Sequence, residues 1–371
     1  EKPIFGKFTP YPTYPLGGVV LALSRFVESV DSPESEDLLK RLSKFILDVS
    51  GTFDKMGRFK GHTHSGGILT AAVGILRWAL RQQDAQTIQR MKNTFDWCCK
   101  HSSSWGWVPD DLGRDGASCE TCALVDAIHL GLLIARHVDP SYYDIVERYA
   151  RNQLMENQFI KTDMIVPQGD YPLRKRIVKA VHGSWASYSF PNSLDNGLTG
   201  IEGCCLGAGI RGCYLVWEQG ITKDAGKVMV NMAFSRNSPW VEVISHRPYA
   251  GRIDIRVHDA PKLLARIPEW VSKNDLRVFV NEQRVEAVFG GNRYIEFTGL
   301  QKNASIQIEY PLPLRDSSEE VCGKVYNVQW KGDTVIGIQP KGQLYPLYER
   351  AGMISPNTPL IDWPYDHQQG G

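Results

Sequence analysis

The chain has 371 residues, which is enough for two or three domains with a substantial apolar core. Its 42 basic and 41 acidic residues nearly cancel, so no global field attracts the chain to nucleic acid or to an anionic membrane. No apolar run approaches the roughly 18 residues of a membrane-spanning helix, and the opening Glu1-Lys2-Pro3 lacks the apolar segment of a secretion signal. We therefore expect neither nucleic acid nor a membrane as a partner.

The first part of the chain has apolar residues at helical spacing in seven stretches. These predicted helices are Leu16–Phe26, Leu38–Val49, Ile68–Leu80, Ile88–Cys99, Cys122–Ala135, Tyr142–Met155 and Ile201–Trp217. Between Lys161 and Asn196 lies a long connection without periodicity, rich in proline, serine and tyrosine. Connections of this length inside a compact domain are usually functional or disordered.

After Gly226 the apolar residues alternate with a period of two, which is typical of short strands in an antiparallel β-sandwich. The predicted strands are Val228–Ala233, Val241–Ser245, Ile253–Val257, Leu263–Ile267, Leu276–Val280, Tyr294–Phe297 and Ser305–Tyr310, with Val325–Trp330 and Thr334–Ile338 as further candidates. The fold class is thus α+β and multidomain, with a helical domain over 1–222 and a β-sandwich region with a C-terminal extension over 223–371. We expect the change from helix to strand near 218–228 and only antiparallel pairing after it.

Eight cysteines include the vicinal pairs Cys98-Cys99 and Cys204-Cys205. Vicinal cysteines rarely bridge each other, because a disulfide demands a geometry that is hard to reach across one peptide bond. The pattern does not match a secreted disulfide framework, so we expect a reducing compartment and a cytoplasmic protein.

Two short segments offer one carboxylate and three thiols: Glu120-Thr121-Cys122 and Cys204-Cys205. Four such ligands can form a closed tetrahedral zinc shell. The alternative is a set of buried thiols without a metal, since free cysteine is among the most buried residue types. Cys98-Cys99 has no Glu-x-Cys partner and lies in an amphipathic run, so we interpret it as core.

The neighbourhoods of the two segments, Ser118–Ala123 and Gly203-Cys204-Cys205 with Gly207 and Arg211 after it, resemble glycoside hydrolase family 127, the bacterial β-L-arabinofuranosidases. Further short matches are Gly61-His62, Tyr149–Leu154, Val228–Asn231, Gly251–Ile253 and Leu264–Trp270. Together these matches cover most of the stretch from about residue 60 to 315.

The resemblance implies that Glu120, Cys122, Cys204 and Cys205 hold one zinc ion and that Cys204 is the nucleophile. It implies a retaining hydrolase that acts on a furanosidic, β-L-arabinofuranoside-like oligosaccharide or glycan. The family's catalytic domain is an (α/α)6 toroid of twelve helices, and its Gly-His motif lies past the middle of the barrel. Here Gly61-His62 comes near the start, so we expect either a toroid that is incomplete at the N-terminus or a reduced barrel. The oligomeric state is left open, a homo-oligomer included.

The chain differs from the family in its proton donor. The family places a glutamate in a glycine-rich turn before the Glu-x-Cys. No glutamate occurs between Cys98 and Glu120, so Asp110 or Asp111 is the candidate acid. The alternative for both is a solvated turn after Pro109.

His62 matches a family position that contacts the sugar. The alternatives are a helix-capping loop and, because His62 and His64 are two residues apart, a second metal site. Trp105 and Trp107 are candidates for stacking on a sugar ring, or else they pack the barrel mouth.

Two rival functions remain. One is a non-catalytic, carbohydrate-associated protein whose zinc is structural. The other is a toroid lyase or epimerase that acts on uronic acids.

Overall fold

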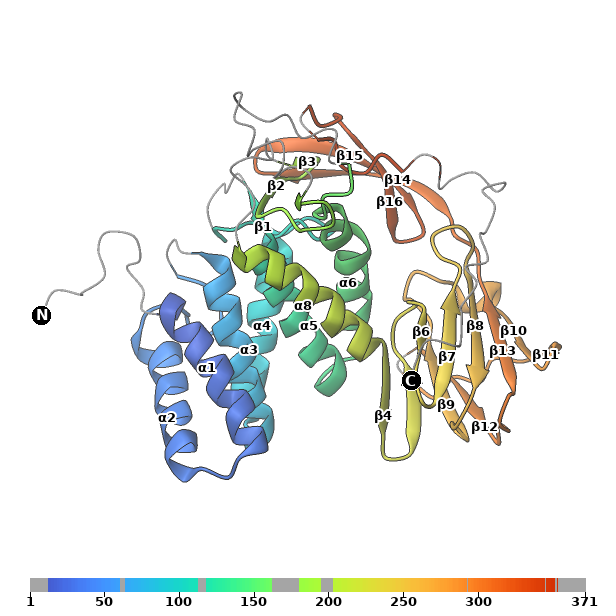
Figure 1. The fold of residues 1–371 in the computed structure, drawn as a ribbon, viewed down its shortest axis with the longest axis horizontal. Helices are drawn as coiled ribbons and strands as arrows, with labels where there is room; N and C mark the ends of the chain where they lie inside the picture. Colours follow the sequence, from blue (N-terminus) through green and yellow to red (C-terminus); the bar gives the residue numbers. More distant parts are fainter. Residues whose placement is uncertain are drawn as a thin grey trace, which may run out of the picture.

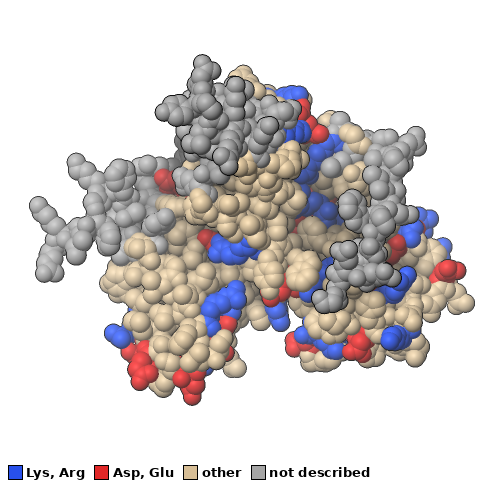
Figure 2. Space-filling view, in the orientation of Figure 1, with Lys and Arg blue, Asp and Glu red and all other residues tan. Residues whose placement is uncertain are grey.

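The computed structural model describes residues 13–60, 64–112, 118–161, 180–194, 203–291, 293–343, 345–350 and 352. In this described part, no helix is both long enough and apolar enough to cross a membrane. On the face shown in Figure 2, basic and acidic side chains are interspersed over both the helices and the β-sandwich.

The helical part consists of two rows of helices (Figure 1). One row is α1 (Thr13–Ser29), α3 (Ser65–Gln82), α5 (Thr121–His137) and α8 (Gly203–Gly220), each packed on the next. The other is α2 (Pro33–Lys44), α4 (Ala85–His101) and α6 (Tyr142–Tyr149), packed against the first. The π-helical turns η1 (Phe45–Val49) and η2 (Ala150–Leu154) extend α2 and α6. All seven predicted helices are present, but the described residues do not form a complete toroid of twelve helices.

Local signals in the sequence explain where these helices begin and how closely they pack. The Ser32 side chain caps α2, and Pro33 occupies its first turn. The Asp84 carboxylate accepts a hydrogen bond from the Thr87 N–H at 3.1 Å and so caps α4. In the first row, a Cβ at Gly74 would lie 2.7 Å from the backbone nitrogen of Leu21. Glycine is therefore required where α1 crosses α3.

The β-sandwich has a six-stranded sheet, in the order β11-β10-β13-β8-β7-β6, facing a four-stranded sheet, in the order β12-β9-β5-β4. The strands of the first are β6 (Arg236–Asn237), β7 (Val241–Ser245), β8 (Arg252–Val257), β10 (Arg277–Val280), β11 (Gln283–Val285) and β13 (Ser305–Glu309). Those of the second are β4 (Ile221–Asp224), β5 (Lys227–Val230), β9 (Lys262–Arg266) and β12 (Tyr294–Thr298). A short 3-10 helix, η4 (Lys273–Asp275), precedes β10. Alternating residues such as Val241, Ile255 and Ile306 form an apolar core between the sheets.

The prediction that all pairing after the helices is antiparallel is wrong at one place. β5 pairs with β9 in parallel, with Met229 opposite Leu264. The chain leaves β5, passes through three strands of the opposite sheet and returns to lie beside β5 in the same direction. Parallel neighbours require such a crossover, and no hairpin signal in the sequence marks it.

The last strands, β14 (Leu314–Val321), β15 (Lys324–Lys331) and β16 (Thr334–Gln339), form an antiparallel sheet of their own that lies over the helices (Figure 1). Tyr326, Val328 and Trp330 belong to the helical core rather than to the sandwich core. The chain after the sandwich thus returns to the helical part. The division at 222/223 remains a prediction, although α8 ends at Gly220 and β4 begins at Ile221.

A buried cluster of charges joins the helices, the sandwich and the last sheet. The Arg247 guanidinium contacts Glu147 of α6 at 2.6 Å and also Asp333, which lies between β15 and β16. Arg151 contacts Glu147 at 2.8 Å, and Arg266 of β9 contacts Asp144 at 2.5 Å. Burial alone would raise the pKa of Glu147, but the charges of Arg247, Arg151 and Arg266 outweigh it and lower the pKa to about 2.

We expect Glu147→Gln to lower the free energy of unfolding at pH 7 by about 3 kcal/mol, because it leaves buried guanidinium groups uncompensated. The loss should shrink as the pH falls from the ordinary carboxyl pKa of 4.5 toward 2, because over that range the unfolded chain takes up a proton at Glu147 while the folded wild type stays ionised there. Urea unfolding at several pH values measures both effects. Arg41→Ala removes an exposed pair with Asp37 and should cost less than about 1 kcal/mol. Equal losses for the two variants would contradict this assignment.

Candidate functional site

Three thiols and one carboxylate meet where the first turns of α5 and α8 lie side by side. Glu120 ends the short strand β1 (Cys119–Glu120), directly before α5, and Cys122 lies in the first turn of α5. Cys204 and Cys205 lie in the first turn of α8. One ligand atom from each of the four residues lies within 4.8 Å of all the others. The structure thus brings together the four residues that the two sequence segments singled out.

The short sheet of β1, β2 (Tyr188–Phe190) and β3 (Ser193–Leu194) fixes the carboxylate end of this cluster. Glu120 pairs with Tyr188 in the β1–β2 ladder. The next backbone N–H, that of Thr121, donates to the carbonyl of Ser187 at 3.0 Å. The same carbonyl lies 3.9 Å from the Cys205 sulfur. Ser187, just before β2, therefore contacts both the segment that contains Glu120 and Cys122 and the sulfur of Cys205.

The spacing of the ligand atoms fits a small tetrahedral cation. The Cys122 and Cys205 sulfurs are 3.4 Å apart, the Cys204 and Cys205 sulfurs 3.8 Å, and the Cys205 sulfur is 3.5 Å from Glu120 Oε1. Bonds of about 2.3 Å to sulfur, at tetrahedral angles, place two sulfurs about 3.8 Å apart. The residues present therefore fit a metal ion with a three-sulfur, one-oxygen shell.

The thiols differ in exposure and in their tendency to ionise. Cys205 is buried, whereas Cys204 is exposed. Desolvation and the neighbouring Cys205 raise the pKa of Cys204 to about 11. The hydrogen bond with Cys205 raises the pKa of Cys122 far above its ordinary value, and the same bond lowers the pKa of Cys205. The thiols thus do not all ionise near neutral pH on their own, and a bound cation would supply the missing charge compensation.

A second cluster shares Glu120 with the first. His64, at the start of α3, places Nε2 2.7 Å from Glu120 Oε2 and Nδ1 2.7 Å from Asp110 Oδ1. Burial would lower the pKa of His64, but the contacts with Asp110 and Glu120 outweigh it and raise the pKa to about 10. The ring is then protonated, and each of its nitrogens lies beside a carboxylate oxygen. His64 therefore connects the candidate acid Asp110 to the thiol cluster.

Backbone contacts position Asp110 beside α3. Its carbonyl accepts from the Ser65 N–H at 2.6 Å, and its own N–H donates to the Ser118 carbonyl at 2.8 Å. Asp111 is its neighbour in sequence. Among the described residues, a carboxylate oxygen of Asp110 lies within 4.8 Å of ligand atoms of His64 and Glu120, whereas Asp111 belongs to no such cluster. This difference favours Asp110 over Asp111 as the acid, although the role itself remains a prediction.

The expected stacking of Trp105 and Trp107 on a sugar ring is wrong. Both side chains are completely buried in the helical core. The Trp107 indole donates to the carbonyl of Ser189 at 2.9 Å, and Trp105 packs edge-on against Tyr326 of β15. The last sheet folds back over Trp105, and Trp107 lies against β2. Trp105 and Trp107 therefore pack inside the protein, which was the alternative to sugar stacking.

Two other predictions have different outcomes. His62 lies outside the described residues. Cys98 is fully buried in the helical core, as expected.

The sequence suggested His64 only as half of a metal pair with His62, and it suggested no role for the pair of Asp126 and Arg211. Asp126 is buried on α5 and accepts from Thr70 and from Arg211, each at 2.6 Å. The position of His64 directly before a predicted helix was a local signal, but only the fold reveals that it faces Glu120. The signal for Asp126 was a carboxylate inside an otherwise apolar helix.

No family model matches the chain, and no curated protein matches it either. Solved structures do match the fold. One titled a glycoside hydrolase has a TM-score of 0.67 at 13% identity, over 85% of this chain and 59% of its own. A GH127 β-arabinofuranosidase has a TM-score of 0.66 at 16% identity, over 85% and 55%. A GH127 β-L-arabinofuranosidase from Geobacillus stearothermophilus T6 has a TM-score of 0.60 at 14% identity, over 85% and 57%.

These similarities establish a shared fold. They also show that the chain spans little more than half the length of the matching structures.

We expect the purified chain to contain about one equivalent of a thiophilic divalent metal, because the four ligand atoms already have metal-like spacing. Elemental analysis by mass spectrometry measures this content. Cys122→Ser should reduce it severalfold, whereas Cys98→Ser, a substitution in the core, should leave it unchanged. Less than about half an equivalent in the wild type would contradict a metal site here.

Proposed function

We propose that this chain is the catalytic portion of a zinc-thiolate retaining glycoside hydrolase that acts on a β-L-arabinofuranoside-like glycan. The observation that carries the proposal is the convergence of Glu120, Cys122, Cys204 and Cys205, with Cys204 as the exposed thiol. The fold shared with structures titled GH127 β-arabinofuranosidases supports the substrate class.

In this proposal Glu120, Cys122, Cys204 and Cys205 would hold zinc, the borderline-soft ion that such a sulfur-rich shell favours. Bound zinc would keep the Cys204 thiol deprotonated at neutral pH. Cys204 then provides the attacking sulfur, because it is the exposed thiol of the cluster. The buried Cys205 orients the shell, and the β1–β2 pairing holds Glu120 in place.

Retention requires two displacements at the anomeric carbon. In the first, the Cys204 sulfur forms a bond to that carbon while the glycosidic C–O bond breaks and the leaving oxygen takes a proton from Asp110. In the second, Asp110 accepts a proton from water, the water oxygen bonds to the anomeric carbon, and the C–S bond breaks. The Cys204 thiolate and the protonated Asp110 are thereby restored.

One observation favours a second candidate, a carbohydrate-associated protein with a structural zinc. Asp110 Oδ1 lies 2.7 Å from His64 Nδ1, whereas a general acid must reach the leaving oxygen. If substrate binding does not separate this pair, Asp110 cannot donate a proton and the cluster serves only to hold α5 and α8 together.

We expect Cys204→Ser to reduce hydrolysis of 4-nitrophenyl β-L-arabinofuranoside on the order of a thousandfold or more, because a serine hydroxyl is a far weaker nucleophile than a thiolate. Release of nitrophenol by the zinc-loaded full-length protein is the measurement. Cys98→Ser should keep the wild-type rate. Similar rates for the two variants would remove any special role for Cys204, and a wild type without turnover would favour the structural-zinc candidate.

Asp110→Asn should slow the cleavage of a methyl arabinofuranoside about a hundredfold or more, because that leaving group needs a proton. The cleavage of the nitrophenyl substrate should slow much less, because nitrophenolate leaves without protonation. Asp111→Asn is the matched control and should leave both rates near the wild-type value. If Asp111→Asn rather than Asp110→Asn separates the two substrates, Asp111 is the acid.

A further inference from the structure

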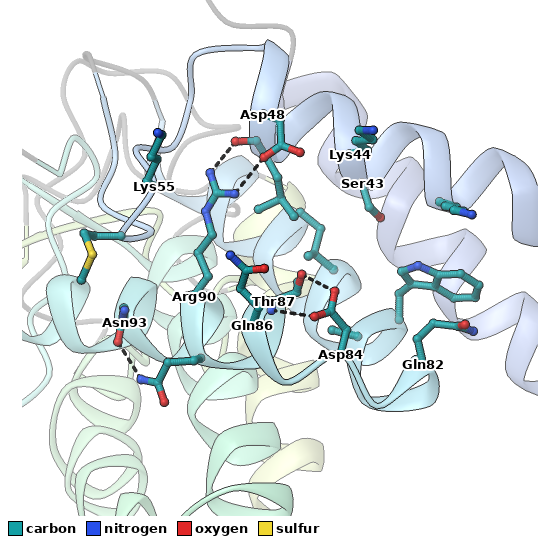
Figure 3. Close-up of a pocket in the computed structure, with 17 residues that line it drawn as sticks. Ser43, Lys44, Asp48, Lys55, Gln82, Asp84, Gln86, Thr87, Arg90 and Asn93 are labelled. Carbon is teal, nitrogen blue, oxygen red and sulfur yellow. Dashed lines mark hydrogen bonds and ion pairs between the residues drawn. The ribbon is translucent and has the colours of Figure 1, made fainter.

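A cavity of about 990 Å³ lies between α2 with η1, the end of α3 and the start of α4 (Figure 3). It opens at the end of α3 far from the thiol cluster. Trp78, which lines it, follows His64 by fourteen residues, a rise of about 20 Å along the helix. The cavity is therefore separate from the site described above.

The lining combines an aromatic ring with groups that form hydrogen bonds. Trp78 is partly exposed, and the amides of Gln82 and Gln86 also line the cavity. Asn93 lines the opposite side, where its amide oxygen accepts from Gln89 at 2.8 Å. Ser43 lies on the α2 side, where its side-chain oxygen is buried and has no hydrogen-bond partner in the described structure. An aromatic face beside several amides and a hydroxyl suits a ligand with apolar C–H faces and many hydroxyls.

Basic side chains outnumber acidic side chains in the lining of the cavity. The Arg90 guanidinium is paired with Asp48 at 3.0 Å (Figure 3). Asp84 is occupied as the cap of α4, since it accepts from the backbone N–H and the hydroxyl of Thr87. The lining lysines, Lys40, Lys44 and Lys55, make no ion pair within the described residues. A ligand that offers carboxylates would satisfy them.

We propose that this cavity binds an acidic oligosaccharide, that is, a short glycan with uronic-acid units. Trp78 packs on a sugar ring, the amides and Ser43 bind hydroxyls, and the lysines pair with carboxylates. The choice of a glycan rests on the proposed function, and the cavity would then hold part of a larger substrate away from the thiol cluster.

Isothermal titration of the zinc-loaded chain with trigalacturonic acid tests the proposal, with the methyl-esterified trimer as the uncharged match. The acid should bind, and the ester should bind about tenfold more weakly. Lys40→Gln with Lys44→Gln should weaken binding of the acid about tenfold but leave binding of the ester unchanged. Lys100→Gln with Lys227→Gln is the control pair outside the cavity and should have no effect. Trp78→Phe should weaken binding of both trimers, and thermal unfolding shows whether this variant stays folded.

Absence of binding at millimolar trimer would overturn the proposal. Equal losses of affinity for the two lysine pairs would also overturn it. So would displacement of the trimer by citrate at similar concentrations, because either result would mean that the cavity binds anions without specificity. Cys204→Ser should bind the trimer like the wild type. If it does not, the trimer binds at the thiol cluster and this proposal is wrong. Because binding is the readout, a failure of hydrolysis does not affect the outcome.

Discussion

The candidate site depends on the packing of α5 against α8 with their first turns together. A helix N-terminus carries unpaired N–H groups and partial positive charge, which favour anionic groups such as thiolates and carboxylates. Two such termini meet here, and the cysteines and Glu120 lie at or beside them. His64 then adds a positive charge on the side of Glu120 that faces away from the sulfurs. Four groups that repel one another when ionised are thus placed where the surroundings, and a metal ion, can compensate them.

Contacts between distant described parts of the chain support this packing. The buried cluster of Glu147, Arg247 and Asp333 joins α6, the sandwich and the last sheet across distant parts of the sequence. The last sheet in turn contacts the segment that leads to Asp110. Glu319 of β14 accepts from the Ser104 N–H at 2.8 Å, and Tyr326 packs on Trp105. The buried charge cluster thereby helps to determine where the candidate acid lies.

The sequence was sufficient for the helices, for most strands and for the four residues of the thiol cluster, because each rests on a local pattern. Amphipathic spacing marked the seven helices, and Glu-x-Cys with Cys-Cys singled out the four residues that the fold brings together. Long-range pairing was not available from such patterns. The parallel contact of β5 with β9 and the return of β14–β16 to the helices depend on topology. For the same reason Trp105 was misassigned, since the sheet that buries it lies more than two hundred residues later.

We infer that these three sulfurs and one carboxylate bind a single zinc ion. X-ray absorption at the zinc edge of the purified chain tests this binding. We expect a first shell of three sulfurs at about 2.3 Å and one oxygen at about 2.0–2.2 Å, with one sulfur lost in Cys204→Ser. A shell made only of nitrogen and oxygen, or a shell unchanged by Cys204→Ser, would contradict it.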